Sequence, residues 1–228
     1  MTDATQNWPT RKCGSIVLGV VALWLCADTA AAQRAALIVD TAASHIYAIT
    51  YRNGVLSFLG HDHVITAPRW SAEVCLDRAA VERSYARFVV DAGALIIDDD
   101  SARRRARLGS GPSRRQREQL QRKMLDAAHL NAAVYPELRF ESTAVASEDQ
   151  RNLRVQGHLT IRGVSHVVAM PALIEQYASN QFGLSGKLTV KQTAFGIKPE
   201  SIAGVVKVAD AIDLFIRLQG MESSDGCR

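Results

Sequence analysis

Two histidines flank one aspartate in the stretch Leu59-Gly60-His61-Asp62-His63-Val64-Ile65, LGHDHVI. Alternate side chains of an extended segment point to opposite faces, so His61 and His63 should share a face and Asp62 should take the other. Two imidazoles on one face could supply two ligands to a zinc ion, which needs three or four. Asp62 could instead hold one imidazole in a fixed tautomer, as a carboxylate does beside a metal-ligating histidine.

No second motif completes a metal site or a catalytic site. The remaining histidines, His45, His129, His158 and His166, stand at no diagnostic spacing from the pair. The chain also lacks a Gly-x-Ser-x-Gly nucleophile motif, so we expect no enzyme activity and no cofactor. Four interpretations of LGHDHVI stay open. We favour a structural polar corner over a ligand-mouth element that hydrogen-bonds a polar head group, and both over a metal site or an acid–base site.

The N-terminus indicates export. Arg11 and Lys12 precede the apolar run at 15–27, and the small residues Ala30-Ala31-Ala32 follow. This order is typical of a secretory signal peptide, here residues 1–32 with cleavage after Ala32. The apolar run has 13 residues, whereas a membrane-spanning helix needs about 20. We therefore expect a periplasmic or secreted protein.

Cys75 and Cys227 remain after that cleavage. An oxidising compartment would allow them to form a disulfide. Cys227 lies in the segment 221–228, whose Ser223-Ser224-Asp225-Gly226 composition predicts a flexible tail. Pairing and two free thiols both stay open.

Between these ends, apolar and polar residues alternate. In WSAEVCLD, for example, Trp70, Ala72, Val74 and Leu76 share one face, which is the pattern of a half-buried strand with one wet face. Antiparallel sheets show this pattern, so a closed barrel or a sandwich is expected. The predicted strands cover residues 36–41, 44–51, 63–77, 84–98, 137–147, 152–162, 165–176, 183–192 and 205–218.

The segment 101–135 breaks the alternation. It begins as a basic loop, and Ser113 and Gln116 then have the spacing of a capping box at a helix start. Leu120, Met124 and Ala128 would share one face of a helix of about four turns. Residues 103–123 hold nine basic residues and the single acid Glu118, so contact with anionic lipid head groups is one option and a solvated surface is the other. Outside the cytoplasm, nucleic acid is not an expected partner.

The second half of the chain resembles the YceI-like family. The resemblance is carried by VYPELRFEST (134–143), VQGHLTIRGVSHVVAMP (155–171), GLSGKLTVKQTAFGIKP (183–199) and VKVADAIDLFIRL (206–218), with DAGALIIDDD (91–100) consistent. It implies a lipocalin-like, eight-stranded antiparallel barrel with one helix beside it or at its end, over residues 33–220. It also implies a cavity for a polyisoprenoid or fatty-acyl ligand, and a homodimer. The chain departs from the family at Met124-Leu125-Asp126-Ala127-Ala128, where a Phe-rich motif is common, and in its heavy basic run.

Two functional hypotheses follow. The first is a non-enzymatic carrier of an amphipathic lipid, because a small barrel either fills its interior with side chains or holds one ligand. The second is a metal-binding or metal-dependent protein that uses His61 and His63. For the carrier, the alternation and the resemblance place these residues toward the ligand: Trp70, Phe88, Phe140, Leu159, Met170, Leu188, Phe195 and Leu214.

Overall fold

The computed structural model describes residues 34–54, 60–149, 151–178, 180–199, 201–202, 206–223 and 227. The chain separates into units 1–31 and 32–228, and every described residue belongs to the second unit. The predicted signal peptide, residues 1–32, therefore lies outside the described residues.

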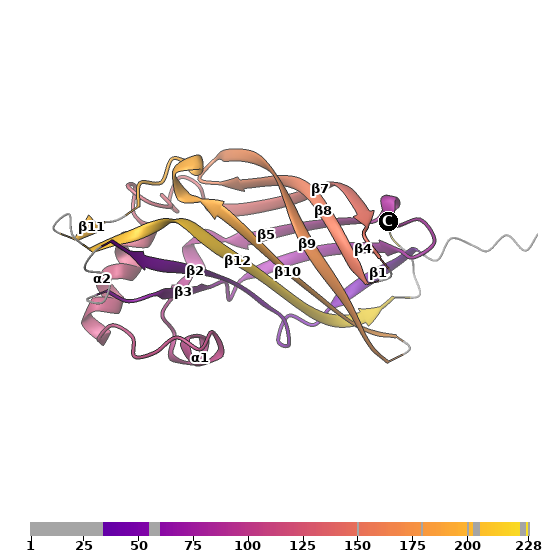
Figure 1. Cartoon of the computed structure of the whole chain (residues 1–228), viewed down its shortest axis with the longest axis horizontal. Helices are drawn as coiled ribbons and strands as arrows, with labels where there is room; N and C mark the ends of the chain where they lie inside the picture. Colours follow the sequence, from indigo (N-terminus) through magenta and orange to yellow (C-terminus); the bar gives the residue numbers. More distant parts are fainter. Residues whose placement is uncertain are drawn as a thin grey trace, which may run out of the picture. The chain divides into compact units, whose positions relative to one another are not determined.

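Eight antiparallel strands close into a barrel (Figure 1). Their order around the barrel is β1-β4-β5-β7-β8-β9-β10-β12, and pairing of β1 with β12 completes the circle. The predicted fold class is confirmed. The strands of the barrel are β1 (Arg34–Val39), β4 (Trp70–Asp77), β5 (Tyr85–Asp91), β7 (Glu137–Ser147), β8 (Asn152–Ile161), β9 (Val164–Ala178), β10 (Gln181–Lys191) and β12 (Val206–Glu222).

The long strand β12 joins the barrel to a smaller wing of sheet. On one side it pairs with β10 along residues 211–221. On its other side it pairs first with β2 (His45–Asn53) and then, through its last three residues, with β1. The sheet continues from β2 to β3 (His63–Thr66) and β6 (Ile96–Ile97), while β11 (Ser201–Ile202) pairs with the start of β12.

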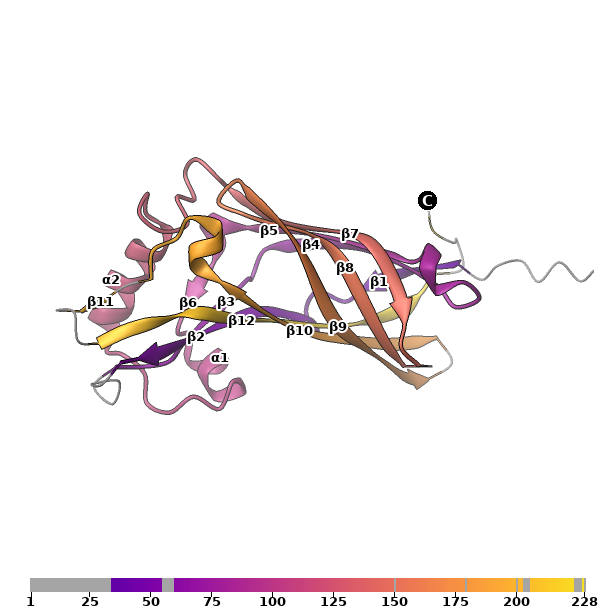
Figure 2. The ribbon, with the colours of Figure 1, turned by 45° about the horizontal axis from the view of Figure 1, so that its top comes forward.

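Two helices lie near this wing, at the left in Figures 1 and 2. The helix α2 (Arg114–Leu125) begins at the predicted capping box, in which the Ser113 backbone N–H donates to Gln116 Oε1 at 2.8 Å. Met124 on this helix is buried and Leu120 is half-buried, whereas Ala128 lies beyond its end. No helix among the described residues is long and apolar enough to cross a bilayer.

The second helix, α1 (Asp100–Arg105), corrects the prediction of a basic loop from residue 101. The Asp99 side chain accepts hydrogen bonds from the N–H groups of Ser101 and Ala102, which caps the helix and starts it before the basic run. Its Ala102 and Arg103 side chains are buried.

Two predicted strands are each divided in the structure. The segment 63–77 forms β3 and β4, separated by residues 67–69, where Pro68 has no N–H to donate to a ladder. The segment 84–98 forms β5 and β6, separated by a 3₁₀ turn (Ala92–Ala94) whose Ala94 N–H is bonded to the Asp91 side chain at 3.1 Å.

The end of the barrel away from α2 is filled with side chains. Phe182 and Leu218 are almost completely buried there, in one cluster with Leu37 and Leu76. The predicted flexible tail is wrong at its start, because Met221 and Glu222 belong to β12 and pair with β1. Cys227 forms a disulfide with the buried Cys75 of β4, with their Cα atoms 5.7 Å apart. Of the two options that the sequence left open, the structure has the paired cysteines.

Candidate functional site

An apolar cavity of about 260 Å³ occupies the α2 half of the barrel. Its walls come from β5, β7, β8, β12 and the β2–β3–β6 wing, and α2 closes part of it. The inward residues follow from strand register. Leu214 pairs with Ala48 and Ile216 pairs with Ile46, and all four line the cavity. The alternation that predicts strands therefore also produces a continuous apolar wall.

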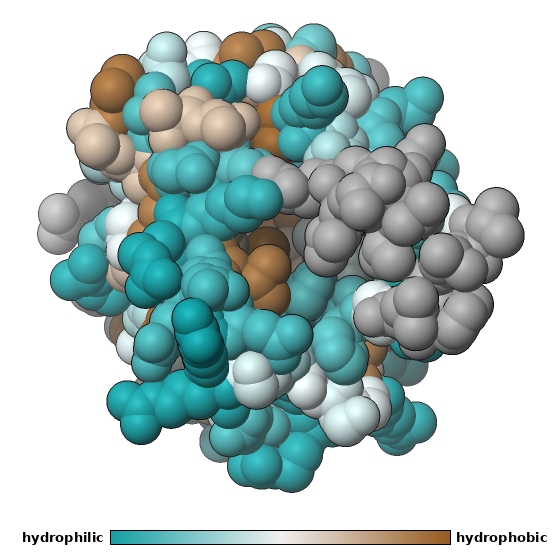
Figure 3. All heavy atoms as spheres, turned by 90° about the vertical axis from the view of Figure 1, so that its left-hand side faces the viewer, coloured by the Kyte–Doolittle hydropathy of each residue, from teal (hydrophilic) through white to brown (hydrophobic). Residues whose placement is uncertain are grey.

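Polar side chains gather at the rim of this cavity. Lys123 of α2, His129, Arg139 of β7 and Gln192 are among its lining residues. Lys123 is exposed, whereas Met124, the next residue of α2, is buried. Arg139 borders the cavity but is exposed and ion-paired with Glu137 of the same strand. The view from the α2 end shows brown apolar atoms in a recess surrounded by teal hydrophilic residues (Figure 3). The cavity thus has an apolar interior and a polar rim.

Five of the eight predicted ligand-binding residues line this cavity, namely Phe88, Phe140, Leu159, Phe195 and Leu214. The other three lie elsewhere. Trp70 lines a smaller, more polar pocket beside α1. Met170 is buried, and its sulfur occupies the space that a side chain on Gly186 would need. Leu188 packs against the main hydrophobic core. The alternation of apolar and polar residues shows which side of a strand faces the barrel interior. It does not show where along the strand that interior is empty.

The structure divides the LGHDHVI stretch between two roles. His63 begins β3 opposite Thr50, its side chain is 14% exposed, and it lines the cavity. His61 precedes the strand and is not among the lining residues. Asp62 turns away from the imidazoles, because its carboxylate accepts from the Arg52 backbone N–H at 2.9 Å.

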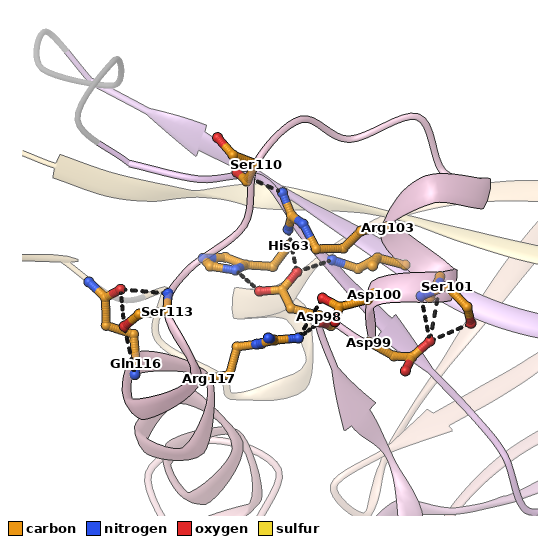
Figure 4. A network of polar contacts seen from close by, with 12 residues as sticks. His63, Asp98, Asp99, Asp100, Ser101, Arg103, Ser110, Ser113, Gln116 and Arg117 are labelled. Carbon is orange, nitrogen blue, oxygen red and sulfur yellow. Dashed lines mark hydrogen bonds and ion pairs between the residues drawn. The ribbon is translucent and has the colours of Figure 1, made fainter.

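The carboxylate that holds His63 is Asp98, not Asp62. The distance from His63 Nδ1 to Asp98 Oδ2 is 2.5 Å, and Asp98 Oδ1 lies 2.5 Å from Arg103 Nη1 (Figure 4). The Val64 N–H also donates to Asp98 Oδ1, at 3.2 Å, and Arg103 Nη1 donates to the Asp62 carbonyl at 2.8 Å. Asp98 lies 35 residues from His63, so no short-range motif in the sequence pairs them.

Asp98 is a fully buried carboxylate in an unusual backbone conformation. Burial by itself opposes ionisation, but the hydrogen bond from His63, the contact with Arg103 and the bond from Val64 outweigh it and lower the pKa of Asp98. Its φ of 54° lies in the left-handed region, which costs a non-glycine residue about 1 kcal/mol. Such strain persists where the surroundings fix the residue, and it is common at functional sites.

The other histidines do not join His63. His45 lies near Arg105 at 3.4 Å, His129 is bonded to Asp126 at 3.0 Å, and His166 contacts the Ala194 carbonyl at 2.8 Å. His158 is exposed on β8. Within the described ranges, no group of three or more His, Cys, Asp or Glu side chains could hold a metal ion. The described part of the chain therefore offers no further ligands that would complete a metal site with His61 and His63.

The basic segment 103–123 is also divided. Arg103 is buried in its ion pair with Asp98, and Arg117 donates to the Asp98 carbonyl and to Asp100, so these two residues serve the fold. The prediction of a surface role is wrong for Arg103. The remaining basic residues of the segment are exposed: Arg104, Arg105, Arg107, Arg114, Arg115, Arg122 and Lys123.

The fold and cavity define a closed antiparallel barrel with an apolar chamber open near one helix. The chain belongs to the YceI-like domain family, whose model matches residues 38–220. The resemblance found in the sequence is thereby confirmed. A UPF0312 protein of Pseudomonas savastanoi pv. phaseolicola is 31% identical over 98 residues, covering 41% of this chain. A UPF0312 protein of Pseudomonas putida is 30% identical over 101 residues, covering 42% of this chain. These matches span about half the length of each relative (48% and 50%).

Solved structures share the fold at low sequence identity. BcnA of Burkholderia cenocepacia superposes with a TM-score of 0.62 at 20% identity, covering 80% of this chain and 99% of BcnA. A YceI protein of Campylobacter jejuni gives 0.55 at 18% identity, covering 70% and 85%. A domain of Saccharophagus degradans described as polyisoprenoid-binding gives 0.54 at 11% identity, covering 84% and 100%.

Proposed function

We propose that this protein is a non-enzymatic binding protein that holds the chain of an amphipathic lipid in its barrel cavity. The observation that carries the proposal is the apolar chamber lined by Phe88, Phe140, Leu159 and Leu214. Each methylene buried there contributes about 0.8 kcal/mol. A chain of about 16 carbons could gain roughly 13 kcal/mol before the costs of ordering it are subtracted.

The ligand class follows from the two environments of the cavity. A polyisoprenoid or fatty-acyl chain suits the apolar interior, and a polar head suits the rim with Lys123, His129 and Gln192. The Saccharophagus degradans domain, described as binding polyisoprenoids, supports the same class of ligand. Most of the cavity-lining residues are aliphatic or aromatic, which is typical of a site that binds an apolar ligand.

We further propose a periplasmic or secreted location. Two features support it: the signal-peptide pattern in residues 1–32 and the disulfide between Cys75 and Cys227, a bond typical of oxidising compartments. The homodimer implied by the family resemblance stays a prediction.

Contact with a membrane surface belongs to the same proposal. The exposed basic residues of α1 and α2, together with Lys123 at the rim, would bring the cavity opening toward anionic head groups. Each basic residue near such a surface contributes roughly 1 kcal/mol at most. Arg122 and Lys123 are adjacent, exposed residues in the last turn of α2, so they are the test positions. Arg122→Glu with Lys123→Glu should weaken sedimentation with vesicles containing phosphatidylglycerol, but not with phosphatidylcholine vesicles.

Native mass spectrometry of protein isolated from periplasm without detergent or chelator tests the binding proposal. An added mass of several hundred daltons that extracts into organic solvent is the expected result. The same spectrum reports cleavage after Ala32 and the oligomeric state. Protein that carries no organic mass, and that takes up none from total membrane lipid, would contradict the proposal. A stoichiometric metal mass instead would revive the metal hypothesis for His61 and His63.

A further inference from the structure

His63 connects a buried ion pair to the cavity. One ring nitrogen, Nδ1, faces Asp98 at 2.5 Å, and the ring itself is part of the cavity wall. No described residue forms a hydrogen bond with the other nitrogen, Nε2. Figure 4 shows the ring held from one side by Asp98, which is held in turn by Arg103. The side that is not held is available to a molecule in the cavity.

The carboxylate of Asp98 determines what Nε2 can do. An ionised carboxylate only accepts hydrogen bonds, so the proton of a neutral imidazole must sit on Nδ1. The lone pair is then on Nε2, which becomes an acceptor. Arg103 balances the charge of Asp98 from the opposite side at 2.5 Å, so the imidazole is not required to carry the compensating charge.

We propose that His63 Nε2 accepts a hydrogen bond from a hydroxyl head group of the bound lipid, and that Asp98 and Arg103 are positioning residues for this contact. The inference rests on the proposed function, because it concerns the ligand of the same cavity. The ligand class it names is a long-chain alcohol or other O–H donor.

The position of His63 separates it from the charged rim. Its side chain is 14% exposed, whereas Lys123 of the rim is exposed. An anionic head group placed beside His63 would lose its hydration in a largely buried position, which is costly for a charge. Beside His63, the neighbouring lining residues are Thr50, Ala48 and Ile65, which supply one hydroxyl and no charge. A neutral head that donates one hydrogen bond fits this position.

The backbone supports a fixed geometry for the pair. Asp98 is held in the left-handed region, its N–H donates to the Val64 carbonyl at 2.7 Å, and its carboxylate accepts from the Val64 N–H at 3.2 Å. Val64 directly follows His63, so the carboxylate and the imidazole are carried by backbones that are bonded to each other.

Calorimetric titration with three ligands tests the inference on delipidated protein. Dodecan-1-ol can donate a hydrogen bond, 1-methoxydodecane has the same chain and cannot, and dodecanoate is an anion. We expect the alcohol to bind about 2- to 10-fold more tightly than the ether, the value of one net hydrogen bond. Equal affinities would overturn the inference while leaving the proposed function intact. If none of the three ligands binds, the proposed function itself fails.

Two variants sharpen the test. In His63→Phe the ratio of alcohol to ether affinity should fall to about 1, whereas the matched change His158→Phe, on the exposed face of β8, should preserve it. Asp98→Asn keeps the imidazole but presents an amide N–H₂ to Nδ1, because Arg103 and Val64 require the amide oxygen. The proton then moves to Nε2, which becomes a hydrogen-bond donor. Both the ether and the alcohol can accept that bond, so the ratio of their affinities should fall toward 1.

Nitrogen NMR of the histidine ring provides a readout that a purely structural role would not change. Nδ1 should carry the proton in the wild-type protein and Nε2 should carry it in Asp98→Asn. An Nε2-protonated ring in the wild type, or an unchanged ligand ratio in a folded Asp98→Asn protein, would refute the assigned roles.

Discussion

The disulfide between Cys75 and Cys227 should contribute a large part of the stability of the barrel. We consider the replacement Cys227→Ser, which removes the bond and leaves Cys75 as a thiol. Cys75 is 2% exposed, and a buried free cysteine behaves as a small apolar residue, so its reduction costs little by itself. The opposite replacement, Cys75→Ser, would bury a hydroxyl and confuse the result.

The expected magnitude follows from the loop that the bond closes. The two cysteines are 152 residues apart, and the loss of chain entropy in the unfolded state for a loop of this length corresponds to about 5 kcal/mol. Native disulfides commonly deliver less, so we expect Cys227→Ser to lower the free energy of unfolding by about 3 to 5 kcal/mol. For a chain of this size, the melting temperature should fall by roughly 6 to 20 °C.

Urea unfolding followed by the fluorescence of Trp70 measures this effect. Trp70 is the only tryptophan after residue 32, and it lies on the same strand as Cys75. Wild-type protein treated with dithiothreitol serves as the control and should unfold at the same urea concentration as the variant. A loss below about 1 kcal/mol would refute the loop-closure reasoning. Two titratable thiols in periplasmic protein would show that the bond does not form.

Three further predictions test the cavity, the buried carboxylate and the closure of the barrel. Leu214→Asp places a carboxylate in the apolar wall, so a lipid retained by the wild type should bind more than about 10-fold more weakly in a titration of the folded variant. Equal affinity would contradict the assigned wall. The folded-state pKa of Asp98 is lowered, so its contribution to stability is complete above the unfolded-state pKa near 3.8 and is lost as the pH falls through the lower folded-state value. In urea unfolding from about pH 6 to pH 2.5, the free energy of unfolding should therefore fall less steeply with acid in Asp98→Asn than in the wild type. If stability depends on pH equally in the variant and the wild type, Asp98 does not contribute to the loss of stability in acid. A Cβ on Gly220 would lie 2.1 Å from the Ile38 carbonyl oxygen, so Gly220→Ala should cost about 1 to 3 kcal/mol in urea unfolding, whereas Gly109→Ala, with open space around it, should change little. Equal costs would show that β1 gives way without penalty.

Most of the barrel could be predicted from local patterns. Alternation located the strands because each has one wet face, and Ser113 with Gln116 located the start of α2. The divisions at Pro68 and at Ala92–Ala94 were missed because the apolar pattern runs on across both. The sequence does not predict the helix α1, because six residues give too little periodicity, although Asp99, three residues before Ala102, is a capping signal.

The candidate site was harder to predict because its geometry depends on distant residues. The sequence places His61, Asp62 and His63 together, whereas the structure separates them and brings Asp98 to His63 across the β3–β6 pairing. The triplet Asp98-Asp99-Asp100 gives no sign of which carboxylate turns inward. Leu188 and Met170 satisfy the alternation as well as Leu214 does, yet only Leu214 lines the empty part of the barrel. Where a barrel is hollow is a property of all its strands together.

The double pairing of β12 has a consequence for how the chain folds. This strand pairs with β10 on one side and with β2 and β1 on the other, and it is the last strand of the barrel in chain order. Until residues 206–222 have been synthesised, β10 and β1 both present unpaired edges and the chamber has no closing wall. Since β1 pairs with β12 across a very large sequence separation, Val39 with Gly220, this pairing should be a slow, late step. A growing chain therefore cannot close its barrel before residues 206–222 have been synthesised, and its exposed edges are the places where an unfinished molecule would aggregate.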